Sequence, residues 1–147
     1  MGHVYTLLLM DLSWINYSDT TGFDKTGFAQ DGSLSGMGWD NIWVLSFGVQ
    51  QDIGDLTLRA GYNYGGNPID DENTFFNIGS PLHTSHHLSL GGSYKIYKQA
   101  TIDIGYSHVF ENSQSSPMYN MNGPVPGTEV ETKLGYDQIS IGFTLPF

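Results

Sequence analysis

The last nine residues, Ile139-Ser-Ile-Gly-Phe-Thr-Leu-Pro-Phe147, decide the fold. Every second residue from Ile139 to Phe147 is large and apolar, and the residues between them are small or polar. This strict alternation predicts a β-strand whose two faces meet different surroundings. The apolar face would meet a second sheet in a soluble sandwich. In an outer-membrane barrel it would meet lipid, and the polar face would line the lumen.

Composition restricts the classes of protein that the chain can belong to. At 147 residues it forms one domain or less. Aromatic residues make up 14%, charged residues only 14%, and there are 19 glycines, which favours β-structure over helices. The net charge of −10 argues against non-specific nucleic-acid binding, because few basic groups are present to neutralise phosphates. Without cysteine, the chain has no disulfide, cysteine-metal site or catalytic thiol.

No apolar stretch is long enough for a membrane helix, which needs roughly 18 to 20 residues. The most apolar run, from Val4 to Met10, is too short and lacks the basic start of a signal peptide. We therefore expect that an exported form either begins upstream of Met1 or is already mature. The mean hydropathy of −0.24 also suits a membrane barrel, in which only alternate residues are apolar.

The alternation predicts about six strands joined by connections of two lengths. The strands are expected at 4–17, 39–50, 56–64, 86–97, 101–110 and from about 128 to 147. Long polar loops at 18–38, 65–85 and 111–127 alternate with tight turns at 52–55 and 98–100. Long loops at one end and short turns at the other are typical of an up-and-down transmembrane β-barrel, with the long loops extracellular and the turns periplasmic.

Strand register follows from the turns, because paired residues must share a face. A two-residue turn at Ile53-Gly54 predicts four apolar pairs and places Gly48 opposite Arg59. The apolar pairs are Val49 with Leu58, Phe47 with Ala60, Leu45 with Tyr62, and Trp43 with Tyr64. A three-residue turn at 98–100 places Lys95 opposite Asp103, as a lumenal pair in which each charge has a partner.

Aromatic side chains are expected at both ends of the apolar band, where rings lie at headgroup level. The belt residues are Trp43, Tyr62, Tyr64, Tyr94 and Tyr106, joined near the short turns by Tyr97 and Phe147. A soluble sandwich gives no reason for two belts together with the loop asymmetry, so the barrel is the favoured interpretation.

Several stretches, taken together, resemble the FadL/TodX family of outer-membrane transporters of hydrophobic compounds. They are Asp11-Leu-Ser-Trp-Ile-Asn-Tyr-Ser18, Leu56-Thr-Leu-Arg-Ala-Gly-Tyr62 with Asn67-Pro68, His86-His-Leu-Ser-Leu-Gly-Gly-Ser-Tyr94, Ala100-Thr-Ile-Asp-Ile-Gly-Tyr106 and the closing strand. The resemblance implies part of a fourteen-stranded barrel that passes long-chain fatty acids or aromatic hydrocarbons. It covers only the family's C-terminal portion, without the lumenal hatch and the kinked early strand.

Three groups of residues invite a chemical interpretation, and each has a simpler one. His83, His86 and His87 could ligate a transition metal, but His86 and His87 point to opposite faces of a strand. The acidic run 70–72 lacks the spaced oxygen ligands of a calcium loop. A catalytic set of His108, Ser107 and Asp103 is disfavoured because His108 has the opposite parity to the other two. We expect no enzyme activity, no metal and no cofactor.

Arg59, the one arginine of the sequence, is expected to face the lumen. It could attract the carboxylate of a fatty acid, or it could pair with lumenal acids or with the carbonyls of a hatch.

The sequence thus predicts a single barrel segment over 1–147 in the bacterial outer membrane, serving passive transport of hydrophobic compounds such as long-chain fatty acids. Lumen-facing residues would be Arg59, Asn63, Lys95 and Asp103. Phe143, Leu145 and Phe147 resemble the C-terminal signal read by the barrel-assembly machinery. Six strands leave two open edges, so missing N-terminal strands or other copies of the chain are expected partners, beside lipid and a hydrophobic small molecule. The alternative is a truncated structural sheet that self-assembles through its edges into an oligomeric barrel or fibre.

Overall fold

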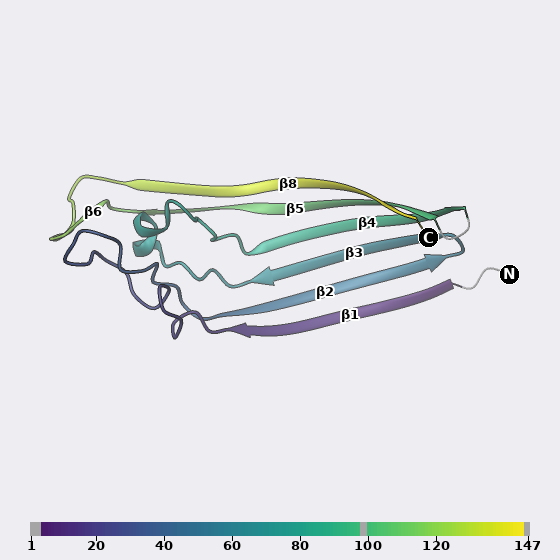
Figure 1. Cartoon of the computed structure of the whole chain (residues 1–147), viewed down its shortest axis with the longest axis horizontal. Helices are drawn as coiled ribbons and strands as arrows, with labels where there is room; N and C mark the ends of the chain where they lie inside the picture. Colours follow the sequence, from purple (N-terminus) through teal and green to yellow (C-terminus); the bar gives the residue numbers. More distant parts are fainter. Residues whose placement is uncertain (1–3, 98–99, 146–147) are drawn as a thin grey trace.

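The computed structural model describes residues 4–97 and 100–145, and these form one antiparallel sheet of six strands (Figure 1). Each strand pairs with the next one along the chain in an up-and-down meander. The strands are β1 (Val4–Ile15), β2 (Ile42–Ile53), β3 (Leu56–Gly65), β4 (His86–Tyr97), β5 (Ala100–Ser116) and β8 (Val130–Thr144). The fold predicted from the alternation, an all-β antiparallel barrel segment, is confirmed.

The long connections lie together at one end of the sheet (Figure 1). The second of them contains two short 3-10 turns, η1 (Asp71–Asn73) and η2 (Phe75–Asn77). The third contains a two-stranded ladder of β6 (Tyr119–Asn120) and β7 (Gly123–Pro124). No helix in the described part of the chain is long and apolar enough to cross a membrane.

The sheet is a single layer with two different faces. On what we call the apolar face, large side chains stand exposed, with Leu8 76%, Ile139 74% and Phe143 70% accessible. The opposite, polar face carries residues such as Ser46, Asn63 and Ser107. A sandwich would have buried the apolar face under a second sheet, so the soluble interpretation is not supported.

β1 and β8 are the edges of the sheet, and within the described residues they do not pair with each other (Figure 1). The barrel is therefore open in this structure.

The register predicted between β2 and β3 is wrong by two residues. Ile53 pairs with Leu56, so the turn is Gly54-Asp55 rather than Ile53-Gly54. Gly54 has a φ of +61°, a backbone conformation that glycine adopts without steric cost and that tight hairpin turns require. None of the five predicted pairs is present. Instead, Leu58 pairs with Gln51, Ala60 with Val49, Tyr62 with Phe47, Tyr64 with Leu45, and Gly61 rather than Arg59 with Gly48. A shift of two keeps every side chain on its predicted face.

The predicted Lys95–Asp103 pair is also wrong. Lys95 lies opposite Thr101, and Asp103 lies opposite Ser93. The displacement of two residues has two parts: Tyr97 pairs with Ala100, which was expected in the turn, and a register irregularity between Lys95 and Tyr97 adds the second residue. Residues 98–99 of the expected turn lie outside the described residues.

Several predicted boundaries differ from the structure, and two of the differences change which residues belong to the loops. Trp39 was expected in the second strand but lies in the first loop, where it is only 6% exposed. The stretch 111–116 was expected to be a loop, but β5 continues through it, pairing with β8 as far as Ser116. Polar residues can extend a hairpin in this way because the ladder needs only backbone hydrogen bonds. Such a polar extension shows no alternation of hydrophobicity in the sequence, so it was not predicted.

Candidate functional site

The middle of the polar face is a wall of small residues. Gly48 pairs with Gly61, and Gly91 pairs with Gly105. Ser89 and Ser107 are also paired, and their hydroxyl oxygens lie 3.0 Å apart. Where a residue has no side chain, paired backbone faces the space beside the sheet, and beside Gly48 the Leu9 side chain of β1 borders this space. This part of the wall offers little obstruction and few exposed polar groups to a molecule that moves along it.

Nearer the tight turns, the polar face carries a hydrogen-bonded group that we call the polar-face cluster: Gln50, Asp52, Thr57, Arg59, Ser93 and Asp103. Arg59 donates from Nε to Gln50 Oε1 at 2.9 Å and from Nη1 to Ser93 Oγ at 2.6 Å. Ser93 in turn donates to Asp103.

The second carboxylate of the cluster is Asp52, which accepts hydrogen bonds from Gln50 Nε2 and from Thr57 Oγ1, the latter at 2.6 Å. Arg59 is thus linked to two carboxylates, each through one neutral side chain. Two carboxylates thus lie close to its positive charge, and among the described residues its hydrogen bonds go to Gln50 and Ser93.

The other predicted lumen residues lie around this cluster or away from it. Lys95 joins Asp52, Thr57 and Tyr5 around an open hollow of about 490 Å³. Asn63 lies closer to the long loops and donates from Nδ2 to Ser46 Oγ at 2.7 Å. The structure therefore brings Arg59 and Asp103 together through Ser93, but it does not bring all four residues into one site.

The predicted belt residues lie on the apolar face, most of them towards the long loops. Trp43 contacts Trp14 of β1, with ring centroids 6.5 Å apart. Tyr62 and Tyr64 both pack against His86, and the Tyr62 hydroxyl forms a hydrogen bond with His86 Nδ1. Near the tight turns, Tyr94 pairs with Leu56 and Ile102, and Tyr97 is exposed at the end of β4.

Tyr106 belongs to a polar group on the apolar face that sequence reasoning missed. Its hydroxyl donates to Asp137 Oδ1 at 2.7 Å, and His108 Nδ1 lies 2.7 Å from the same oxygen. Asp137 has the same parity as Ile139, so the alternation places it among apolar residues. Only the pairing of β5 with β8 shows that Tyr106 and His108 form hydrogen bonds with the Asp137 carboxylate.

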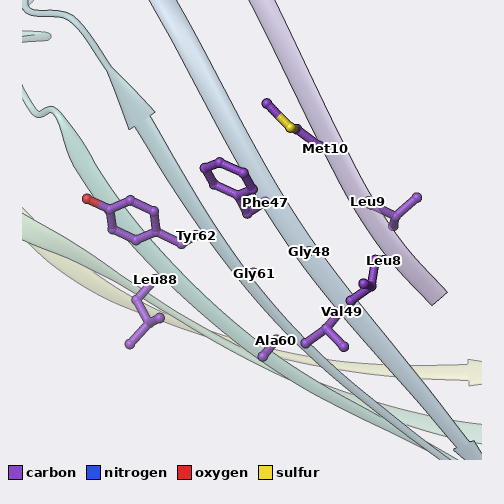
Figure 2. A pocket seen from close by; sticks show the side chains of 10 residues that line it. All are labelled: Leu8, Leu9, Met10, Phe47, Gly48, Val49, Ala60, Gly61, Tyr62 and Leu88. Atoms are coloured by element: carbon purple, nitrogen blue, oxygen red, sulfur yellow. The ribbon is translucent and has the colours of Figure 1, made fainter. Parts of the chain in front are cut away.

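A shallow groove crosses the apolar face where Ala60 stands between larger residues. Figure 2 shows Met10, Phe47, Tyr62 and Leu88 around the groove, which has a volume of about 500 Å³. Its lining is almost entirely hydrocarbon, so an acyl chain of the surrounding lipid suits it better than any polar ligand.

The candidate catalytic and metal-binding residues do not come together. His108 lies on the apolar face, while Ser107 and Asp103 lie on the polar face. His83 is buried in a loop, His86 lies on the apolar face and His87 on the polar face. The described residues contain no group of three His, Cys, Asp or Glu side chains that could hold a metal ion.

The three long loops, 16–41, 66–85 and 117–129, pack into what we call the loop cap. Trp39 is at its centre, edge-on to Tyr17 and beside Phe23, and its Nε1 donates to Asn77 Oδ1 at 2.7 Å. Contacts between residues so far apart in sequence leave no periodic signal, and this is why sequence reasoning gave the loops no structure.

His83 ties the second loop to the β5–β8 hairpin. Its side chain is buried, with its Nε2 3.1 Å from Thr132 Oγ1. Its Nδ1 has no hydrogen-bond partner among the described residues. Burial lowers the pKa of His83 below its ordinary value, because the charged imidazolium would lose its hydration.

Two of the three residues that were predicted to form the assembly signal belong to the described part of the chain. Phe143 and Leu145 stand exposed at the end of the apolar face. Phe147 lies outside the described residues.

Comparison with known proteins gives one match. A family model described as outer membrane protein transport protein (OMPP1/FadL/TodX) matches residues 6–144. Neither the curated proteins nor the solved structures gave a match.

Proposed function

The chain belongs to the OMPP1/FadL/TodX family of bacterial outer-membrane transport proteins, and from this premise we propose that it forms part of a barrel wall through which hydrophobic compounds cross passively. The family is one of transporters rather than enzymes. It favours transport over the alternative of a purely structural, self-assembling sheet.

The observation that carries this proposal is the contrast between the two faces of the single-layer sheet. Exposed Leu, Ile and Phe side chains on one face suit lipid, whereas small and polar residues on the other suit a lumen. The wall of glycine and serine offers a passing molecule little to bind tightly. That is what passive movement needs, since a compound held firmly would not leave.

We assign roles to the predicted residues on the same basis. Arg59, Lys95 and Asp103, with Asn63 nearer the loops, would line the passage. Trp43, Tyr62, Tyr64, Tyr94 and Tyr106 would mark the two lipid interfaces. Phe143, Leu145 and Phe147 would be read by the assembly machinery. Because the charge of Arg59 is balanced by Asp52 and Asp103, this wall would not select anions over neutral compounds.

The open edges lead to the proposal that the sheet is completed by further strands. Every unpaired backbone group of β1 or β8 in lipid would cost several kcal/mol, so an open six-stranded sheet is not stable in a bilayer. The OMPP1/FadL/TodX match favours strands of a larger barrel over additional copies of this chain. Native mass spectrometry of the isolated protein would separate the two, because only the second arrangement contains several copies.

Uptake measurements test the transport proposal. In the bacterial host, deleting the gene should lower the entry rate of dilute radiolabelled toluene or laurate several-fold, and a plasmid copy should restore it. Dissipating the proton gradient should leave passage across the outer membrane unchanged, because passive movement needs no energy. Unchanged entry of both compounds in the deletion strain would refute the proposal, and energy-dependent passage would refute its passive character.

A further inference from the structure

The apolar groove of Figure 2 adjoins a group of polar and aromatic side chains on the same face of the sheet. The groove has a volume of about 500 Å³, and its lining includes Met10, Phe47 and Leu88. Tyr62 belongs to both features, because it lines the groove while its hydroxyl forms a hydrogen bond with His86 Nδ1. A molecule with an apolar chain in the groove would therefore place its polar end beside His86.

The group beside the groove, which we call the belt site, surrounds an exposed aromatic ring. Its residues are Tyr62, Tyr64, His86, His108, Phe110 and Asp137. Phe110 is 44% exposed and lies edge-on to two imidazoles, His86 at 6.5 Å and His108 at 4.6 Å. His108 pairs with Leu88 on one side and with Asp137 on the other. The groove thus begins directly beside the belt site, at Leu88.

Two polar atoms of the belt site have no hydrogen-bond partner among the described residues. His86 uses Nδ1 for the Tyr62 hydroxyl, which leaves its Nε2. Asp137 uses Oδ1 for both Tyr106 and His108, which leaves its Oδ2. When the Tyr62 hydroxyl donates to Nδ1, Nε2 carries the ring proton and is a donor, whereas Oδ2 is an acceptor.

This arrangement suits a neutral ring with hydroxyl groups better than a phosphate or an amine. Asp137 would repel a phosphate, and an ammonium group would find only this one carboxylate among the six residues, already bonded at Oδ1. A sugar presents hydroxyl and amide groups at its edge and a C–H face that packs on an exposed aromatic ring such as Phe110. Two strand spacings, about 10 Å, separate the strands of His86 and Asp137, a span that one or two sugar rings cover.

The belt site lies towards the long loops, at the level of the outer leaflet of the membrane. The outer leaflet of a bacterial outer membrane consists mainly of lipopolysaccharide, whose lipid A anchor is a pair of sugars that carries several acyl chains. We propose that the belt site and the groove together bind one outer-leaflet glycolipid, with a sugar ring at Phe110 and an acyl chain in the groove. The proposal rests on the outer-membrane location of the family and is independent of transport.

Binding of purified lipid A and of phosphatidylethanolamine to the full chain in detergent tests the proposal. Native mass spectrometry reports how much of each lipid the protein retains. We expect lipid A to bind about tenfold more tightly, because phosphatidylethanolamine has acyl chains for the groove but no sugar for the belt site. Equal binding of the two lipids, or tighter binding of the phospholipid, would overturn the proposal.

His86→Phe tests the sugar end of the site. The variant keeps a ring beside Tyr64 and Phe110 but loses the Nε2 donor. Lipid A should bind about tenfold more weakly, and phosphatidylethanolamine should bind as before. His87→Phe is the matched control, since His87 is the next residue of β4 and lies on the polar face, opposite Asn63. It should leave lipid A binding unchanged, and equal effects of the two substitutions would overturn the proposal.

Ala60→Leu tests the groove. The added side chain would occupy the space of an acyl chain, so lipid A should bind about tenfold more weakly. Gly92→Leu is the control, because Gly92 lies on the same face outside the groove and its Cβ would meet its nearest neighbours at an ordinary 3.8 Å. Heat-modifiable mobility selects the folded form of each variant for the measurement. Equal lipid A binding by these two folded variants would refute the role of the groove.

Lipid binding is measured on the isolated protein and is therefore separate from uptake. Unchanged uptake in the deletion strain would refute transport and leave the glycolipid site standing. Equal binding of the two lipids would refute the glycolipid site and leave transport standing.

Discussion

Gly135 occupies a position of the β5–β8 ladder that is crowded by backbone. Val109 pairs with Tyr136 and Asn112 pairs with Leu134, so two residues of β5 stand opposite this single glycine. A Cβ at residue 135 would lie 2.7 Å from the Cα of Glu111 and 2.9 Å from its backbone nitrogen. The bulge therefore depends on the absence of a side chain here, because backbone cannot move aside as a side chain can.

Gly135→Ala should lower the free energy of unfolding by about 1 to 3 kcal/mol, the usual cost of overpacking. Urea unfolding in detergent, followed by loss of heat-modifiable mobility, measures it. Gly142→Ala on the same strand is the control, since its Cβ would meet Asp103 Cβ at an ordinary 3.5 Å. It should change stability by less than about 0.5 kcal/mol, and equal losses in the two variants would contradict the crowding.

His83 makes the packing of the loop cap depend on pH. Its pKa in the folded chain lies below the ordinary value of 6.5, which applies when it is unfolded. Above about pH 6.5 the imidazole is neutral in both states and costs nothing. Below that pH, the unfolded loop binds a proton that the folded loop excludes, so the cap loses stability as the pH falls towards the folded pKa.

We expect amide-exchange protection factors in residues 66–85 to fall between pH 7.5 and pH 5. His83→Asn should remove this dependence. His87→Gln should keep it, because His87 lies on the polar face of β4 rather than in the loop cap. Protection that stays constant in the unaltered chain would refute the role of His83.

Within a strand, the face to which a side chain points determines the effect of substituting it. Ile141 and Ser140 are neighbours on β8 that point to opposite faces, opposite Ile104 and Gly105 respectively. Ile141→Arg would place a charge in lipid at a cost of about 2 to 4 kcal/mol. Ser140→Arg would project into the lumen, beside a glycine that leaves room for it.

The heat-modifiable fraction in isolated outer membranes compares the two arginine variants. We expect Ile141→Arg to reduce the folded fraction strongly and Ser140→Arg to leave it near that of the unaltered chain. Equal reduction would mean that both faces meet similar surroundings, which would contradict the barrel.

Alternation in the sequence was sufficient to predict the strands and their faces, because side-chain parity follows directly from a period of two. It could not predict register, since any even shift preserves parity, and the error at Gly54 was such a shift. Of the polar-face cluster, only Arg59 and Asp103 were named from the sequence, because Ser93 lies opposite Asp103 only in the observed β4–β5 register. The contacts of Phe76 with Phe28 and Tyr119 in the loop cap were not predicted at all, since these rings come from three different loops and meet through packing alone.

Across the whole sheet, the apolar band does not follow the rows of paired residues. One row runs across all six strands through Thr6, Gln51, Leu58, Gly92, Ile104 and Ile141. At its β1 end the row is polar, and Thr6 donates to Gln51 at 2.8 Å. At its β8 end, Ile141 lies in the middle of the apolar run from Ile139 to Leu145.

A second row, nearer the long loops, shows the reverse arrangement. It runs through Met10, Phe47, Tyr62, Leu88, His108 and Asp137. Met10 lies within the apolar run of β1 between Leu8 and Trp14, whereas Asp137 lies at the limit of the apolar run of β8. The band is therefore displaced towards the long loops on β1 relative to β8, and strands inclined to the membrane normal explain the displacement.

This inclination gives the last prediction, a difference in depth within each row. Five strand spacings of about 4.8 Å and a tilt of about 40° put the ends of a row roughly 15 Å apart in depth. Nitroxide labels at residues 6 and 141, introduced as cysteines into a chain that has none, should show Thr6 near the periplasmic surface and Ile141 near the bilayer centre. Labels at 10 and 137 should place Met10 near the centre and Asp137 near the outer surface. Equal accessibility to oxygen and to a water-soluble nickel complex at both ends of either row would mean upright strands, and the polar Thr6–Gln51 pair would then lie in lipid without explanation.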